Sequence, residues 1–211
     1  MCIRDRLSIK RSDNKERIKV LNNIEKEIAE IEKYCDERLN AWNDDIGLYT
    51  EFLDDNLNIE SIKNITSSKG RIEFNLIYYR DFEPPMNRYN SMISSGDIKF
   101  IKSEKIKETL TRLHNLNYSN LKTSVEYEKS LKQELINILT ENHSEILFAA
   151  DSYKTSIEIY SSLLHKSIQS DQELKSNLLI QMKYFKSRVS LLKLYMYTLD
   201  ELKSEVENSL D

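Results

Sequence analysis

The chain contains three histidines that could serve metal or proton-transfer chemistry: His114, His143 and His165. A carboxylate-bridged dimetal site in a helical bundle needs glutamate three residues before histidine on two helices. Thr111, Thr140 and Ser162 hold those positions instead. A zinc site needs closely spaced pairs of histidine or cysteine, and no such pair occurs. We therefore interpret each histidine as a surface or partly buried polar residue, and we predict no metal and no cofactor.

Other catalytic patterns are also missing. The segment Ser94–Asp97 is not the Gly-x-Ser-x-Gly turn of a serine nucleophile, and there is no glycine-rich phosphate loop. The many carboxylates are of a kind that is usually solvated on helices, so pairing two of them as acid and base would be arbitrary. The sequence thus predicts no catalytic residue and a protein that is not an enzyme.

Tyrosine is frequent, with twelve in the chain. Tyr153, Tyr160 and Tyr195 fall on apolar stripes, where we expect core tyrosines with the hydroxyl at the edge. The alternative is an aromatic-lined ligand cleft.

Composition indicates an all-α fold. Only three glycines and two prolines occur in 211 residues, whereas ordinary usage is roughly 7% and 5%. Many short strands would need many turns, so few and long elements are expected. The net charge of −4 with interleaved signs argues against a nucleic-acid partner. No apolar run is long enough to span a bilayer, and no secretion signal is visible.

The first six residues, Met-Cys-Ile-Arg-Asp-Arg, match the translation of a transposase adapter used in sequencing libraries. We expect residues 1–6 to be adapter-derived and the native protein to start further upstream; the alternative is a genuine start. On the first reading only Cys35 remains, and a single thiol forms neither an intramolecular disulfide nor a metal site.

A central segment organises the chain. Pro85 suits the first turn of a short helix, Tyr89 and Met92 follow at helical spacing, and Gly96 stands where a left-handed residue would end that helix. Residues 97–102 are then expected to turn, and Ser103 to cap the next helix. The structural signature of this reversal comprises Pro85, Tyr89, Met92, Ser95, Gly96, Ile98 and Ile101.

Long helices are expected on both sides of this segment. The first runs from about Ser12 to Asn58, capped by Ser12 or Asp13, with a possible kink at Gly47. Residues 71–82 are ambiguous, and we favour a short helix or an irregular segment over a lone strand. We expect a second helix to start near Ser103, with a bend at the polar cluster of residues 115–120.

Two more helices follow a reversal near residues 140–144. The third carries an apolar stripe from Ile146 to Leu164. The last opens with Ser170-Asp171-Gln172-Glu173, which we interpret as a capping box with Ser170 as the cap. Its apolar residues recur every seven positions and could pack against the first helix or another chain: Leu178, Phe185, Leu192, Leu199 and Val206. We therefore predict one domain over residues 7–211, an elongated antiparallel bundle of three to four long helices with the reversal near residues 85–101.

The segment Tyr89–Ile101 resembles an uncharacterised bacterial family whose members carry Tyr-x-x-Leu-x-x-Ser-Gly-x-Leu-x-x-Ile. Met92 and Ile98 replace the two leucines. The resemblance covers most of the chain, including the last helix, but only this signature is distinctive. It implies a single N-terminal membrane-spanning helix followed by a long helical domain of unknown function. That span is absent here, which the truncation hypothesis explains, and no catalytic residue is implied.

These observations lead us to expect the extramembrane part of a protein anchored in the bacterial inner membrane, with the domain in the periplasm by the family resemblance. The expected function is protein–protein interaction or scaffolding at the cell envelope, with an unknown protein partner or as a homo-oligomer. The alternative is a sensory domain that binds a small ligand between helices.

Overall fold

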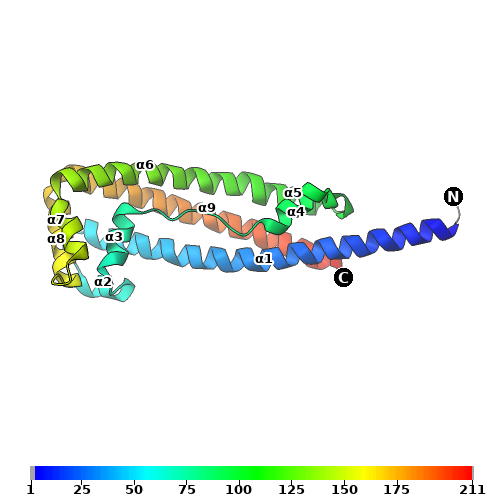
Figure 1. Cartoon of the computed structure of the whole chain (residues 1–211), viewed down its shortest axis with the longest axis horizontal. Helices are drawn as coiled ribbons and strands as arrows, with labels where there is room; N and C mark the ends of the chain where they lie inside the picture. The colour runs from blue at the N-terminus through cyan, green and yellow to red at the C-terminus, as the bar shows by residue number, and fades with distance from the viewer. Residues whose placement is uncertain (1–2, 211) are drawn as a thin grey trace. The chain divides into compact units, whose positions relative to one another are not determined.

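The structure, a computed structural model, describes residues 3–210, and it describes side chains from residue 12 onward. In chain order the elements are α1 (Ile3–Leu53), α2 (Ile59–Ile65), α3 (Lys69–Ile77), α4 (Asn87–Ser95), the 3₁₀ helix η1 (Asp97–Phe100), α5 (Glu104–Thr111), the π-helical segment η2 (Arg112–Asn117), α6 (Tyr118–Asn142), α7 (Ser144–Asp151), α8 (Ile157–Ser170) and α9 (Gln172–Leu210) (Figure 1). Every regular element in this range is helical, which confirms the predicted all-α class.

The described chain forms two compact units. Unit 1 comprises the residues up to Arg38, Glu83–Asn120 and the residues from Leu191 onward. Unit 2 comprises Leu39–Phe82 and Leu121–Ser190. The three longest helices, α1, α6 and α9, each contribute residues to both units. The expectation of one domain with a single bundle of three to four helices therefore stays a prediction.

In unit 1, the end of α9 lies along α1 (Figure 1). The Arg17 guanidinium donates to the Ser209 carbonyl at 3.0 Å, and Lys203 pairs with Glu32 at 2.9 Å. The core of the unit is apolar and includes Leu21, Ile28, Ile31, Leu192, Leu199 and Val206. Helices α4 and α5, the short η1 and the π-helical η2 complete the unit.

In unit 2, parts of α1, α6 and α9 run side by side, and α7 and α8 close one end (Figure 1). One continuous cluster of buried residues joins all of these helices with α2 and α3, and includes Phe52, Ile62, Ile72, Leu135, Tyr160, Leu164 and Phe185. The five residues of the seven-residue stripe of α9 are all buried, so the stripe packs within the chain and not against another chain.

Two helix boundaries that the sequence predicted are confirmed. Gly96 ends α4 in the left-handed conformation at φ 73°, where a residue with a Cβ would be strained. The Ser103 hydroxyl accepts from the Ile106 N–H and caps α5. The polar cluster near residue 115 coincides with the π-helical η2, and α3 confirms a short helix in the ambiguous stretch.

Other boundaries differ from the prediction. Helix α1 begins at Ile3, so Ser12 and Asp13 lie inside it, and it ends at Leu53. Helices tolerate both residue types in their interior at a small cost. The predicted kink at Gly47 is absent, since α1 continues through it. A Cβ at Gly47 would lie 2.8 Å from Cδ1 of Ile65 in α2, so glycine lets the Ile65 side chain pack there without shifting.

The predicted cap of the last helix is wrong by one residue. One Asp171 carboxylate oxygen accepts from the N–H groups of Glu173 and Leu174 at 2.8 and 3.1 Å, whereas Ser170 bonds back to the Ser167 carbonyl. The other Asp171 oxygen lies 2.8 Å from His143 Nε2. A carboxylate cap, whose charge strengthens its hydrogen bonds, competes better for the free N–H groups than a hydroxyl does.

The predicted third helix is also interrupted. Helix α7 ends at Asp151, and α8 begins at Ile157, where the Ser156 side chain caps it. Pro85 lies two residues before the first residue of α4, Asn87, and not in its first turn. None of the helices in the described range is long and apolar enough to cross a bilayer.

Candidate functional site

The signature residues lie in unit 1 around the short helix α4. Met92 and Ile101 are buried, and the Ser95 hydroxyl donates to the Met92 carbonyl at 3.3 Å. Ile98 lies in η1, and Gly96 provides the turn between α4 and η1. The structure thus gives these residues structural roles in the reversal.

The start of α4 is held by a carboxylate from another helix. Met86, at the cap position, has no side-chain acceptor for the free N–H groups. Glu27 of α1 supplies one, since its carboxylate accepts from the Arg88 N–H at 2.6 Å and from the Tyr89 N–H at 3.0 Å. A buried carboxylate at a helix N-terminus is stabilised by these donors and by the helix dipole. Glu27 therefore fixes α4 to α1.

His114 completes this arrangement from the π-helical η2. Its ring stacks on Tyr89 with 3.9 Å between ring centroids, and its Nε2 lies 3.7 Å from a Glu27 oxygen. Its Nδ1 is buried without a hydrogen-bond partner. Burial lowers the pKa of His114 to about 4 and raises the pKa of Glu27, because both charged forms lose water. We call Glu27, Tyr89 and His114 the Glu27 cluster.

A groove of about 360 Å³ opens between α1 and α4, within one turn of Glu27. Its apolar lining comes from Val20, Ile24 and Met92. Polar and charged lining comes from Asn23, Asn87, Arg88, Ser91 and Asp97. This size and mixed lining match small-molecule sites, which commonly measure roughly 300–1,000 Å³.

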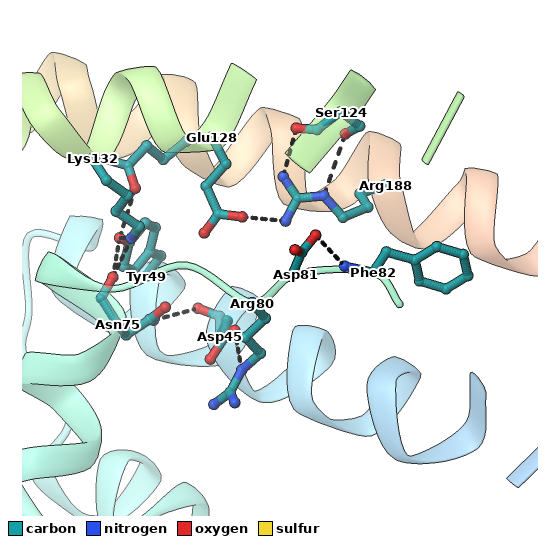
Figure 2. Close-up of polar contacts among 11 residues, drawn as sticks. Asp45, Tyr49, Asn75, Arg80, Asp81, Phe82, Ser124, Glu128, Lys132 and Arg188 are labelled. Atoms are coloured by element: carbon teal, nitrogen blue, oxygen red, sulfur yellow. Dashed lines mark hydrogen bonds and ion pairs between the residues drawn. The ribbon is translucent and has the colours of Figure 1, made fainter. Parts of the chain in front are cut away.

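Unit 2 buries a larger set of charges, which we call the Arg188 network: Asp45, Tyr49, Asn75, Ser124, Glu128, Lys132 and Arg188 (Figure 2). At one end, the buried Asp45 carboxylate of α1 pairs with Arg71 of α3 and, at 3.2 Å, with Arg80 of the segment after α3. Asp45 therefore ties that segment to α1.

Arg188 of α9 is fully buried. Its guanidinium pairs with Glu128 of α6, and it also donates to the Ser124 carbonyl at 2.9 Å and to the Ser124 hydroxyl at 3.3 Å. The guanidinium carbon lies 5.2 Å from the ring centroid of Trp42. Carboxylate, carbonyl, hydroxyl and aromatic face together replace the water that a buried guanidinium loses.

Lys132 of α6 extends the network (Figure 2). Its ammonium donates to the Asn75 carbonyl and, at 2.7 Å, to the Tyr49 hydroxyl. That hydroxyl lies 3.0 Å from the Gln181 side-chain oxygen. Burial lowers the pKa of Lys132 to about 8 and raises the pKa of Tyr49 and of Glu128. The network thus links α1, α3, α6 and α9 through groups that are nearly all hydrogen-bonded.

A third feature lies on the surface of unit 2, at its α7–α8 end. Phe148, Tyr153 and Ile159 are 75%, 91% and 59% exposed. We call these three side chains the α7–α8 tip.

The tip corrects one sequence expectation, since Tyr153 is a surface residue. Tyr153 lies in the break between α7 and α8, so it is not on the apolar stripe that the sequence predicted for one continuous helix. Tyr160 and Tyr195 are buried as predicted, but the expectation of hydroxyls at the edge of the core is wrong, because both hydroxyl groups are buried too.

The expectation of solvated carboxylates is wrong for Glu27, Asp45 and Glu128, which are all buried. The expectation of a surface or partly buried histidine is wrong for His114. The helical spacing of apolar residues in the sequence already indicated burial for two charged residues, Glu27 and Arg188. Glu27 falls three residues after Ile24 and four before Ile31, and Arg188 has the same spacing from Phe185 and Leu192. Each therefore lies on the apolar stripe of its helix.

No His, Cys, Asp or Glu cluster able to hold a metal occurs among the described residues. Cys35 is a buried free thiol, and burial raises its pKa to about 12. Comparison of the chain with protein-family models, with curated proteins and with solved structures gave no match.

Proposed function

We propose that this chain is a non-catalytic helical module for protein–protein interaction or scaffolding at the bacterial cell envelope. The observation that supports it best is the α7–α8 tip. Three large apolar side chains are exposed within residues 148–159. Exposed apolar side chains that gather in one place mark contact surfaces, and aromatic residues are enriched where protein partners meet.

The tip is also held in place. The Lys69 ammonium of α3 donates to the Ala149 carbonyl at 3.1 Å and to the Ser152 carbonyl at 2.5 Å. These bonds satisfy carbonyls at the end of α7 and anchor the connection to α8. A surface that is ordered before binding loses less conformational entropy when a partner docks.

The test is site-specific photo-crosslinking of the folded chain. A photoreactive phenylalanine analogue replaces Tyr153 or, as the control, Tyr197 in unit 1, which is also an exposed tyrosine (68%). We expect a discrete crosslinked species, with a second copy or another envelope protein, from position 153 only. The Phe148→Ser substitution should weaken it. Equal crosslinking from both positions would contradict the proposal.

The membrane anchor and the periplasmic location are part of this proposal, and the resemblance of residues 89–101 supports them. The test is the reading frame upstream of the native gene. We expect it to encode roughly 20 consecutive apolar residues before residue 7. An in-frame stop codon followed by native codons for Met1–Arg6 would contradict the anchor.

A second candidate function is sensing of a small ligand between helices, and the groove between α1 and α4 favours it. Ligand contacts there would fall on α4, which a single buried carboxylate, Glu27, attaches to α1. A ligand that moved α4 would therefore change the hydrogen bonds between the Glu27 carboxylate and the N-terminus of α4.

A further inference from the structure

The charges in the groove between α1 and α4 are not balanced. The Arg88 guanidinium is already paired, since its Nη1 donates to the Glu30 carboxylate at 2.7 Å. Asp97, at the start of η1, lines the same groove. No ion pair joins the Asp97 carboxylate to a basic side chain in the part of the chain whose side chains are described. The charge left without a partner is therefore negative.

The rest of the lining has two kinds of surface. Val20, Ile24 and Met92 form an apolar side, and burial holds all three of them in place. Asn23, Asn87 and Ser91 supply amide and hydroxyl groups at the rim. An occupant that suits the groove thus has an apolar body and a cationic end, and it needs no second charge.

We infer that the groove between α1 and α4 binds a small amphipathic amine, with the ammonium group on Asp97 and the apolar body against Ile24 and Met92. This inference rests on the ligand-sensing candidate and names the class of ligand. A partly buried carboxylate pairs more strongly with an ammonium than a solvated carboxylate does, because the surrounding dielectric constant is lower. An anion would instead meet Asp97 and the Glu30 carboxylate that already occupies Arg88.

The experiment uses three probes with the same apolar chain and different ends: hexylamine, hexanoate and hexanol. Binding to the full chain is measured by isothermal titration calorimetry. It is located by the carbon-13 methyl signal of Met92, with Met182 of unit 2 as the internal control. We expect hexylamine to bind and to shift the Met92 signal only, with hexanol weaker and hexanoate weakest.

Asp97→Asn should weaken hexylamine binding about tenfold, the usual effect of losing a charged hydrogen-bond partner. Asp36→Asn, an exposed carboxylate of α1 in the same unit, is the matched control and should leave binding unchanged. Preferential binding of hexanoate with a shift of Met92 would overturn the amine assignment and keep the ligand-sensing candidate. Absence of any Met92 shift with all three probes would overturn both. Neither result bears on the α7–α8 tip, which the crosslinking experiment tests separately.

Discussion

Both units bury ionisable side chains between helices, but they neutralise them differently. In unit 2 the fully buried Arg188 meets the Glu128 carboxylate, and Ser124 satisfies further donors. In unit 1 the buried His114 stays neutral, because burial lowers its pKa to about 4, and its Nδ1 has no partner. The first solution retains charge and depends on complete pairing, whereas the second removes charge and depends on pH.

The difference follows from the residue types. Arginine does not lose its proton in proteins, so a buried guanidinium has to be paired. Histidine can become neutral at little cost near pH 7. The Arg188 network should therefore respond most strongly to loss of a partner, and the Glu27 cluster to acidification.

The largest effect is expected from breaking the buried ion pair of unit 2. The Arg188→Met substitution leaves Glu128 buried without its cation and should lower the free energy of unfolding by about 3–5 kcal/mol. Urea denaturation followed by circular dichroism measures this.

The double variant E128M/R188M is the informative control. Removing both charges should restore most of the lost stability, since apolar residues can replace a buried ion pair with little loss. A double variant as unstable as Arg188→Met alone would show that packing of the guanidinium, and not charge compensation, dominates.

Acidification should act on unit 1 through His114. The pKa of His114 in the folded chain is about 4, below the ordinary value of 6.5. The contribution of neutral His114 to the free energy of unfolding is therefore complete above pH 6.5 and is lost as the pH falls towards 4. The loss amounts to at most about 3 kcal/mol, from 1.36 kcal/mol per unit. The pKa of Glu27 is raised in the folded chain, so its contribution to stability has the opposite pH dependence and is lost as the pH rises.

The His114→Phe variant separates these effects because phenylalanine retains the stacking on Tyr89. The difference in unfolding free energy between this variant and the original chain should change steadily from pH 6.5 to 4. A difference that does not vary with pH would show that the pKa of His114 is the same in the folded and the unfolded chain, and would contradict its lowering by burial.

Removal of the carboxylate that holds α4 should have a smaller and more local effect. Glu27→Leu leaves the N–H groups of Arg88 and Tyr89 without an acceptor and should cost about 2 kcal/mol. Hydrogen exchange at these two amides should accelerate more than exchange in unit 2.

Glu30→Leu is the matched control for Glu27→Leu, because it removes only a surface ion pair with Arg88. It should cost less than about 1 kcal/mol. If both substitutions accelerated exchange equally, α4 would be held by the surface pair and not by the buried carboxylate.

The smallest predicted effects come from two glycines and have opposite signs. Gly96→Ala forces a Cβ into the left-handed region and should destabilise the chain by about 1 kcal/mol, although no atom lies within 4 Å of the added carbon. Gly70→Ala lies in α3, where the nearest contact is an ordinary 3.6 Å, and should stabilise by about 0.5–1 kcal/mol. Thermal unfolding of both variants measures this. A higher melting temperature for Gly96→Ala would contradict the left-handed role of Gly96, and a lower one for Gly70→Ala would contradict the prediction for α3.

Much of the helical framework follows from the amino-acid sequence alone. The scarcity of glycine and proline and the spacing of the apolar stripes predict helices. Gly96 ends α4 through its own backbone conformation, and Ser103 caps α5 with its own side chain. These features are local. A helix period or a cap depends on residues only a few positions apart, so the chain itself determines them.

The tertiary structure alone decides which charged residues become buried. Glu27 and Arg188 lie on apolar stripes, yet nothing in the sequence near Glu27 shows that the free N–H groups of α4, some sixty positions away, will meet its carboxylate. Likewise Arg188 finds Glu128 only when α6 and α9 pack side by side. Compensation of a buried charge is a long-range property, because the partner comes from another helix and the energy depends on excluding water from both.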